Sequence, residues 1–195
     1  MVRFFTALYK SLLKSLCDEA IFLETTGQYS YISEACPRCG AAGKLTPHGD
    51  YERGFSEHKD GKRVDTRLKP LRFKCRSCGA THAMLPDIVI PYGRYSLRFV
   101  LAVLIAYFER AATVAKICED FGIAASTLYE WKKRMALDKE LLLGVLISRK
   151  TSASAFLRGL LSSNNLSYSL RAFFQRYGLS FMQRRSPSAS RSRPP

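Results

Sequence analysis

Two short stretches, Cys36-Pro-Arg-Cys39-Gly40 and Cys75-Arg-Ser-Cys78-Gly79, decide how this 195-residue chain is expected to fold. A Cys-x-x-Cys turn places two sulfur atoms on one side of a tight loop, and the glycine that follows permits the backbone conformation such a loop needs. Two of these loops facing each other supply four thiolates in a tetrahedron, the closed coordination of structural zinc. The sequence therefore predicts a Zn²⁺ site at Cys36, Cys39, Cys75 and Cys78.

The segment between the two cysteine pairs is longer than the roughly 15–20 residues of compact zinc modules, so we expect an enlarged β-hairpin there. Asp60-Gly61 is a tight-turn dipeptide. Residues 63–75 then alternate in the manner of a strand, and Pro70 places that strand at a sheet edge or a bulge. This pattern is typical of a zinc ribbon, which we assign to residues 36–92.

The same cysteines could also form a redox site or bind an iron–sulfur cluster, and the sequence favours zinc over both. A redox Cys-x-x-Cys usually occurs singly and near a βαβ pattern, which this sequence lacks, whereas the spacing leaves an iron–sulfur cluster open as an alternative. Four cysteines already close the coordination shell, so we expect His48, His58 and His82 to be surface or hydrogen-bonding residues. The metal is expected to support folding, because structural zinc supplies an apparent ~10–16 kcal/mol.

A second pattern covers residues 113–135. If Gly122 ends a short helix, the apolar positions around it bury two short helices against each other. That apolar set is Ile117, Phe121, Ile123, Leu128 and Trp131, with the small Cys118 at the close-packed position. Thr113 is the expected N-cap. The pattern predicts a DNA-binding helix-turn-helix, although helical hairpins that only serve packing share much of it.

In a helix-turn-helix the second helix, here from about Ala125 to Met135, enters the major groove of DNA. We expect side chains near its start to contact base edges and the basic ones to hold phosphates. The predicted contacts are Ala125, Ser126, Tyr129, Lys132, Lys133 and Arg134. Glu130 is ambiguous, because it suits both a cytosine amino group and an ion pair with Arg134.

The rest of the chain divides around these modules. Residues 1–35 form an amphipathic helix and lead-in, since Phe5, Leu8, Leu12 and Leu16 recur at helical spacing. Residues 86–95 are a proline-bounded connector, after which Ser96 caps an apolar helix over 97–110. That helix opens a three-helix unit over 93–136. The predicted fold class is thus α+β, a small β zinc ribbon followed by a mostly α-helical helix-turn-helix unit and a helical C-terminus.

At the C-terminal end we predict a helical extension over 137–178 and a basic disordered tail over 179–195. One apolar stripe recurs at helical spacing: Leu166, Leu170, Phe173, Phe174 and Tyr177. Three uses are open for it, namely docking on the helical unit, homodimer formation and contact with a membrane surface. Docking or self-association is the favoured expectation.

Charge narrows the function further. The chain has 31 Lys and Arg against 16 Asp and Glu, a net charge of +15, which favours a polyanionic partner. No Asp or Glu follows Glu140, so we expect neither a carboxylate metal centre nor enzymatic activity. The longest apolar run, Phe99 to Phe108, is too short for the roughly 18–20 residues of a membrane span. Lys10 and Lys14 interrupt any signal-peptide core, so we expect a cytoplasmic protein with reduced thiols.

Taken in order, the paired cysteines, the run from Arg72 to Pro86 and the segment ending Thr127-Leu-Tyr-Glu-Trp131 resemble the zinc-ribbon plus helix-turn-helix front end of bacterial insertion-sequence transposases. The chain is most similar to small bacterial proteins that carry this front end alone. The resemblance covers about residues 36–135 and implies a double-stranded DNA-binding protein of mobile-element origin in the bacterial nucleoid. The alternative is an RNA- or ribosome-associated zinc ribbon whose helices are only a packing scaffold.

Overall fold

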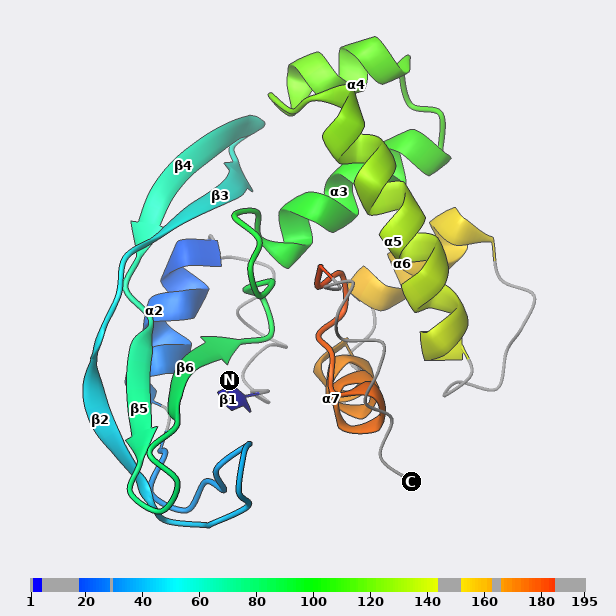
Figure 1. Ribbon diagram of the computed structural model, residues 1–195. Helices are drawn as coiled ribbons and strands as arrows, with labels where there is room; N and C mark the ends of the chain where they lie inside the picture. Colours follow the sequence, from blue (N-terminus) through cyan, green and yellow to red (C-terminus); the bar gives the residue numbers. More distant parts are fainter. Residues whose placement is uncertain (1, 5–17, 29, 144–151, 163–165, 185–195) are drawn as a thin grey trace.

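The computed structural model describes residues 2–4, 18–28, 30–143, 152–162 and 166–184. The class is mixed α+β, as predicted, with the strands along one side of the molecule and helices α3 to α7 on the other (Figure 1). The elements in chain order are β1 (Val2–Phe4), α2 (Asp18–Gln28), β2 (Leu45–Asp50), β3 (Arg53–Lys59), β4 (Lys62–Leu68), β5 (Leu71–Cys75), β6 (Thr81–Pro86), α3 (Leu97–Phe108), α4 (Val114–Asp120), α5 (Ala125–Leu143), α6 (Ala153–Ser162) and α7 (Leu166–Tyr177).

The strands form a four-stranded sheet in the order β1-β6-β5-β2 and a separate hairpin of β3 and β4. Within the sheet only β1 and β6 run parallel. Asp60 and Gly61 connect β3 to β4 with φ values of 50° and 76°. A two-residue hairpin turn of the type that suits twisted strands requires positive φ at both positions. The predicted turn is therefore confirmed.

The predicted strand over 63–75 is interrupted, because β4 ends at Leu68 and β5 begins at Leu71. Pro70 lies in the gap, and it has no N–H to donate to a neighbouring strand. Its carbonyl oxygen still accepts a hydrogen bond from the N–H of Tyr51, at 3.4 Å. The break allows the chain to leave the hairpin and enter the larger sheet.

The first part of the proline-bounded connector belongs to the core, whereas Tyr92 is exposed. Every residue from Pro86 to Pro91 is buried. Ser56 in β3 joins the connector to the helices, since its N–H donates to the Arg94 carbonyl at 2.7 Å and its own carbonyl accepts from the Ser96 N–H at 2.9 Å. These bonds attach the β3–β4 hairpin to the start of α3.

The helical unit begins and turns where the sequence predicted. The Ser96 hydroxyl accepts from the Phe99 N–H at 3.0 Å and caps α3, and the Thr113 hydroxyl accepts from the Lys116 N–H and caps α4. Gly122 has a φ of 58° in the turn between α4 and α5, a conformation that favours glycine. Helix α5 starts at Ala125 and continues past Met135 to Leu143, so the expected boundary at 136/137 lies inside one helix.

Most of the buried side chains form one core that joins both predicted modules. Phe55 and Leu68 of the hairpin belong to the same cluster as the inner faces of α3, α5, α6 and α7. A second, smaller cluster surrounds the paired cysteines and contains Leu45, Phe73 and Met84. The expected ribbon boundary at residue 92 therefore does not separate two cores, because the hairpin packs on the helices and only the metal end is independent.

At the C-terminal end, Leu166, Leu170 and Phe173 are buried within this chain, which matches the docking alternative for the apolar stripe. The prediction of a disordered tail over 179–195 was wrong for its first residues. Phe181 and Met182 are only 3% and 1% exposed, and the Met182 N–H donates to Asp138 at 2.8 Å. Apolar residues at these positions extend the core. Residues 185–195 lie outside the described residues.

At the N-terminal end, the helix expected from Phe5 to Leu16 lies outside the described residues. The parallel strand β1 was not predicted from the sequence. Among the described residues, no helix combines the length and the apolar character needed to cross a bilayer.

Candidate metal centre and nucleic-acid interface

The two Cys-x-x-Cys loops have nearly the same backbone hydrogen bonds. The Gly40 N–H donates to the Cys36 carbonyl at 2.8 Å, and the Gly79 N–H donates to the Cys75 carbonyl at 2.9 Å. Both glycines have positive φ, 73° and 71°, as the sequence predicted for these turns. Strand pairing of β2 with β5 brings one loop beside the other, with Leu45 opposite Cys75.

The four sulfur atoms lie within 4.8 Å of one another. Cys36 Sγ is 3.7 Å from Cys78 Sγ, and Cys39 Sγ is 3.8 Å from Cys75 Sγ. Four sulfurs bound tetrahedrally at the Zn–S distance of about 2.3 Å are separated by about 3.8 Å. The cluster therefore fits one tetrahedral metal ion, and the thiolate donor set suits a soft or borderline metal.

The surroundings shift the pKa values of the cysteines in opposite directions. Although a backbone hydrogen bond from Ala41 opposes the rise, burial and the neighbouring cysteines raise the pKa of Cys39 to about 12. The backbone N–H of Cys78 donates to Cys75 and, against the opposing effect of burial, lowers the pKa of that thiol to about 6. Cys36 and Cys75 are buried, whereas Cys39 is exposed and Cys78 half-buried. Four thiols this close cannot all ionise without a cation between them. A bound metal ion would stabilise the fully ionised state.

His82 contacts the cluster from β6. Its Nε2 atom is 3.3 Å from Cys36 Sγ, and burial lowers its pKa, so the neutral ring is favoured. An imidazole N–H directed at a ligand sulfur orients that ligand without binding the metal. This agrees with the expectation that His82 is a hydrogen-bonding residue.

The structure places the predicted DNA-contact residues on α5. Ala125, Ser126 and Lys133 are exposed, and Tyr129 is 49% exposed. The opposite face of the helix is buried through Leu128, Trp131 and Met135. Together, Ala125, Ser126, Tyr129 and Lys133 form an accessible surface, which we call the α5 face.

The other two predicted contacts have partners within the chain. Lys132 Nζ donates to the Tyr107 hydroxyl at 2.9 Å, and Arg134 pairs with Glu130 at 2.8 Å. Arg134 also lowers the pKa of Glu130. Glu130 therefore makes the intrahelical ion pair, the second of the two uses that the sequence left open. Contact of Lys132 or Arg134 with a phosphate requires these bonds to be exchanged.

Sequence reasoning missed a contact between the β3–β4 hairpin and the turn that precedes α5. Arg63 Nη1 donates to the Gly122 carbonyl at 2.5 Å, and the His58 ring lies 5.0 Å from the Phe121 ring. Arg63 is also over the Tyr95 ring. No local pattern in the sequence signals this pairing, since the partners are 59 residues apart. The contact fixes the turn against the sheet.

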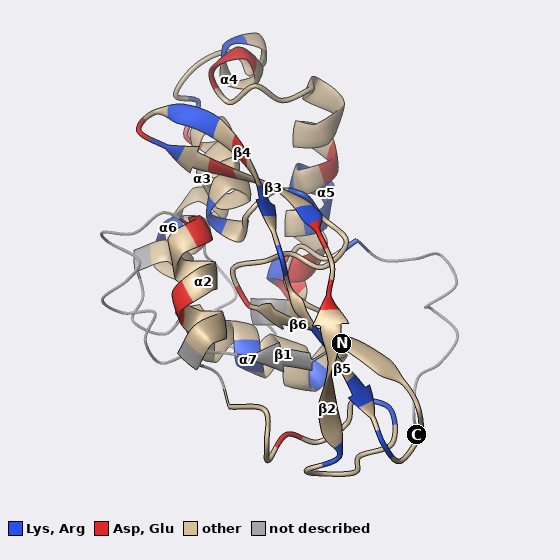
Figure 2. Cartoon of the chain, turned by 90° about the vertical axis from the view of Figure 1, so that its left-hand side faces the viewer, with Lys and Arg blue, Asp and Glu red and all other residues tan. Residues whose placement is uncertain are grey.

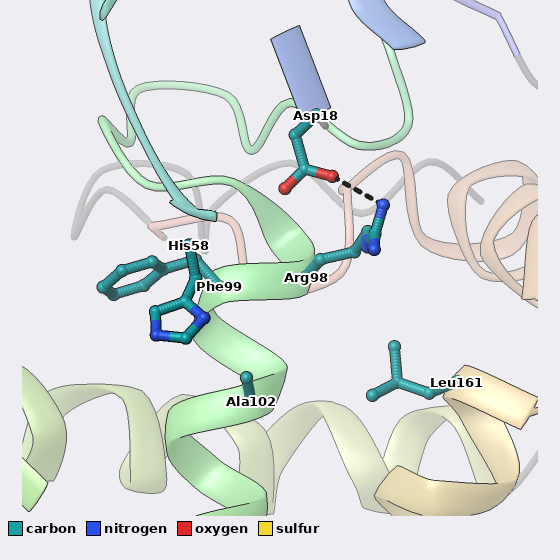
Figure 3. A pocket seen from close by; sticks show the side chains of 6 residues that line it. All are labelled: Asp18, His58, Arg98, Phe99, Ala102 and Leu161. Atoms are coloured by element: carbon teal, nitrogen blue, oxygen red, sulfur yellow. Dashed lines mark ion pairs between the residues drawn. The ribbon is translucent and has the colours of Figure 1, made fainter. Parts of the chain in front are cut away.

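A pocket of about 310 Å³ lies between α2, β3, α3 and α6 (Figure 3). Its lining residues are Asp18, His58, Arg98, Phe99, Ala102 and Leu161. Arg98 Nη1 is 3.2 Å from Asp18 Oδ1, and the Asp18 N–H donates to the Glu57 carboxylate. Burial raises the pKa of Asp18 to about 6, although Arg98 opposes this rise. Arg98 therefore offsets only part of the cost of burying Asp18, and the ion pair fills the pocket wall, so we assign the pocket a structural role.

Asp18→Asn should change how stability depends on pH. The folded-state pKa of Asp18 lies above its unfolded value, so its proton stabilises the fold below about pH 4, and this contribution is lost as pH rises through about 6. Ionisation at neutral pH therefore costs up to about 3 kcal/mol. Relative to wild type, the variant should gain about 1 kcal/mol between pH 5 and 7.5 in urea unfolding. A difference that does not change with pH would contradict this assignment.

Comparison with known proteins adds one match. Residues 36–131, just under half of the chain, match the model of a family described as a domain of unknown function, DUF6431. The matched range begins at the first cysteine of the cluster and ends at Trp131 in α5, so it includes the metal end and three residues of the α5 face, Ala125, Ser126 and Tyr129. No curated protein and no solved structure matches the chain.

Proposed function

We propose that this protein is a zinc-dependent, double-stranded DNA-binding protein in which a zinc ribbon supports a helix-turn-helix. In this proposal the cysteine cluster binds zinc, α4 and α5 are the two helices of the motif, and α5 enters the major groove. The separations of 3.7 and 3.8 Å between sulfur atoms support the metal part of the proposal.

The observation that carries the DNA-binding part is the α5 face. A recognition helix must bury one side against its own domain and leave the residues of its first turns accessible to base edges. Helix α5 does this, because Leu128 and Trp131 are buried while Ser126 and Tyr129 are exposed beside them. The turn before it is fixed by Gly122 and by the Arg63 contact. A rigid approach angle suits groove recognition.

The charge distribution supports a nucleic-acid partner and argues against a catalytic role for this protein. The net charge of +15 favours a polyanion. The stretch after Glu140 has nine basic residues and no carboxylate, so it lacks the groups that hold magnesium in DNA-cutting enzymes. We therefore propose a non-enzymatic protein, and its resemblance to transposase front ends suggests an origin in a mobile element.

The competing proposal is an RNA- or ribosome-associated zinc ribbon, and a competition assay separates the two. Full-length, metal-loaded protein is bound to labelled duplex DNA and challenged with unlabelled duplex DNA or structured RNA at equal nucleotide concentration. We expect duplex DNA to displace the label at a concentration at least tenfold lower than RNA does. A-form RNA has a deep, narrow major groove that side chains cannot enter. Equal competition would favour the RNA proposal.

A further inference from the structure

The sheet at the metal end has one buried face and one basic face. Alternate residues of a strand point to opposite sides of a sheet. Leu45, Phe73 and Cys75 face the cysteine cluster and are buried. Arg72 and Lys74 occupy the alternate positions of β5, and Lys74 is exposed while Arg72 is half-buried.

The strand register brings two more basic residues to the same side. Leu45 pairs with Cys75 and Thr46 with Lys74, so Lys44 and Arg76 are opposite each other one step further along. The Arg76 N–H donates to the Lys44 carbonyl at 2.9 Å, which continues the pairing. The ribbon basic face is therefore Lys44, Arg72, Lys74 and Arg76.

None of these four side chains has an ion-pair partner among the residues that the structure describes. The register places Thr46 and Thr81 beside Lys74, and Ala83 beside Arg72. On the other side of Arg72, strand β2 is irregular between Pro47 and Asp50, and Asp50 pairs with the neighbouring Leu71. The arginines of β4 differ, since Arg63 pairs with Asp65 at 2.8 Å and Arg67 with Glu52 at 2.9 Å. Figure 2 shows blue segments recurring along β5 and the adjoining loops at this end of the molecule.

This arrangement opposes folding. Like charges directly opposite each other on neighbouring strands are destabilising, and residues two apart on one strand are only about 6.7 Å apart. The small core of Leu45, Phe73 and Met84 lies on the other face of the sheet, so the four charges are not part of it. A polyanion bound across the face would convert the repulsion into attraction.

We propose that the ribbon basic face binds the phosphate backbone of duplex DNA as a second contact surface, separate from the α5 face. This inference rests on the proposed function. Single-stranded nucleic acid is held largely by aromatic stacking, and this face carries only threonine and alanine between its basic residues. The ring of Phe73, which lies between Arg72 and Lys74 in β5, is buried on the opposite side. Phosphate contacts are blind to sequence, so the face supplies affinity while α5 supplies discrimination.

The test compares two lysine pairs in the full-length, metal-loaded protein. The variant Lys44→Ala with Lys74→Ala removes two charges from the ribbon basic face. The matched control, Lys59→Ala with Lys62→Ala, also removes two exposed lysines from neighbouring strands, here the pair at the tip of the β3–β4 hairpin. Binding to a duplex of arbitrary sequence is measured by fluorescence anisotropy between 50 and 200 mM salt.

We expect the slope of log affinity against log salt to become shallower by about 1.8 in the first variant, because each lost phosphate contact removes about 0.9. The control should change the slope by less than half as much. Equal changes in the two variants would show an effect of net charge alone and overturn the proposal, as would no change in the first. Lys74→Glu provides a second variant, expected to weaken binding further, and metal content with thermal melting reports folding.

Failure of the inference and failure of the proposed function give different results. If wild-type protein binds duplexes and the first variant binds them equally well, the ribbon basic face is not used and the role of α5 stands. If wild-type protein does not bind duplex DNA at all, the proposed function fails, and the inference fails with it.

Discussion

Removing the metal, or replacing Cys75 by serine, should unfold the sheet end of the molecule. Among the described residues, the apolar core at that end is the small cluster of Leu45, Phe73 and Met84, with Tyr31 packed against it. Structural zinc supplies an apparent ~10–16 kcal/mol, which exceeds what so small a core can provide. We expect chelation to raise amide hydrogen exchange along β2 and β5 to near the unfolded rate. Helices α3 and α5, which belong to the other core, should keep most of their protection.

Cys118 provides the matched control for the cysteine variant. It is half-buried in the helical core and is not part of the cysteine cluster. Cys118→Ala should keep one metal ion per chain, measured by mass spectrometry under native conditions, whereas Cys75→Ser should lose it. If the exchange of β2 and β5 is unchanged after complete metal removal, the metal has no structural role.

Changing the α5 face should remove sequence discrimination with little loss of stability. Ser126→Ala combined with Tyr129→Ala truncates two exposed side chains at the start of α5. A good base contact discriminates against the wrong base by about 1–3 kcal/mol. We therefore expect the preference for a selected duplex over a scrambled one to fall at least tenfold, while binding to the scrambled duplex changes little.

Tyr168→Ala is the control for this variant. Tyr168 is more exposed than Tyr129, but it lies on α7, away from the α5 face. Its replacement should leave the preference unchanged. If both variants lower affinity for all duplexes equally, then α5 does not discriminate between sequences and acts only through charge or stability.

The parts that the sequence predicted well are those with short-range chemistry. The two cysteine loops, the Asp60-Gly61 turn and the caps at Ser96 and Thr113 each depend on residues within a few positions of each other. The start of α5 follows in the same way from Gly122. At these positions the type of side chain determines the backbone conformation directly, so one sequence is sufficient to predict the local structure.

What the sequence did not predict depends on distant residues. The Arg63 contact with Gly122 and the burial of residues 86–91 arise from the way the hairpin folds onto the helices. For Glu130 the sequence allows two uses, and the structure shows the intrahelical pair with Arg134. The ribbon basic face depends on strand register, which links Lys44 to Arg76 across the sheet. Local patterns carry little information about such pairings.

Zinc-dependent recognition of a DNA sequence by α5 is tested by selecting bound duplexes from a random pool with the full-length protein, with metal content measured on the same sample. We expect one enriched motif, recovered only with metal-loaded protein and lost with the Ser126→Ala, Tyr129→Ala variant. Recovery of unenriched duplexes by metal-loaded protein, or of the same motif by the variant, would contradict zinc-dependent recognition by α5.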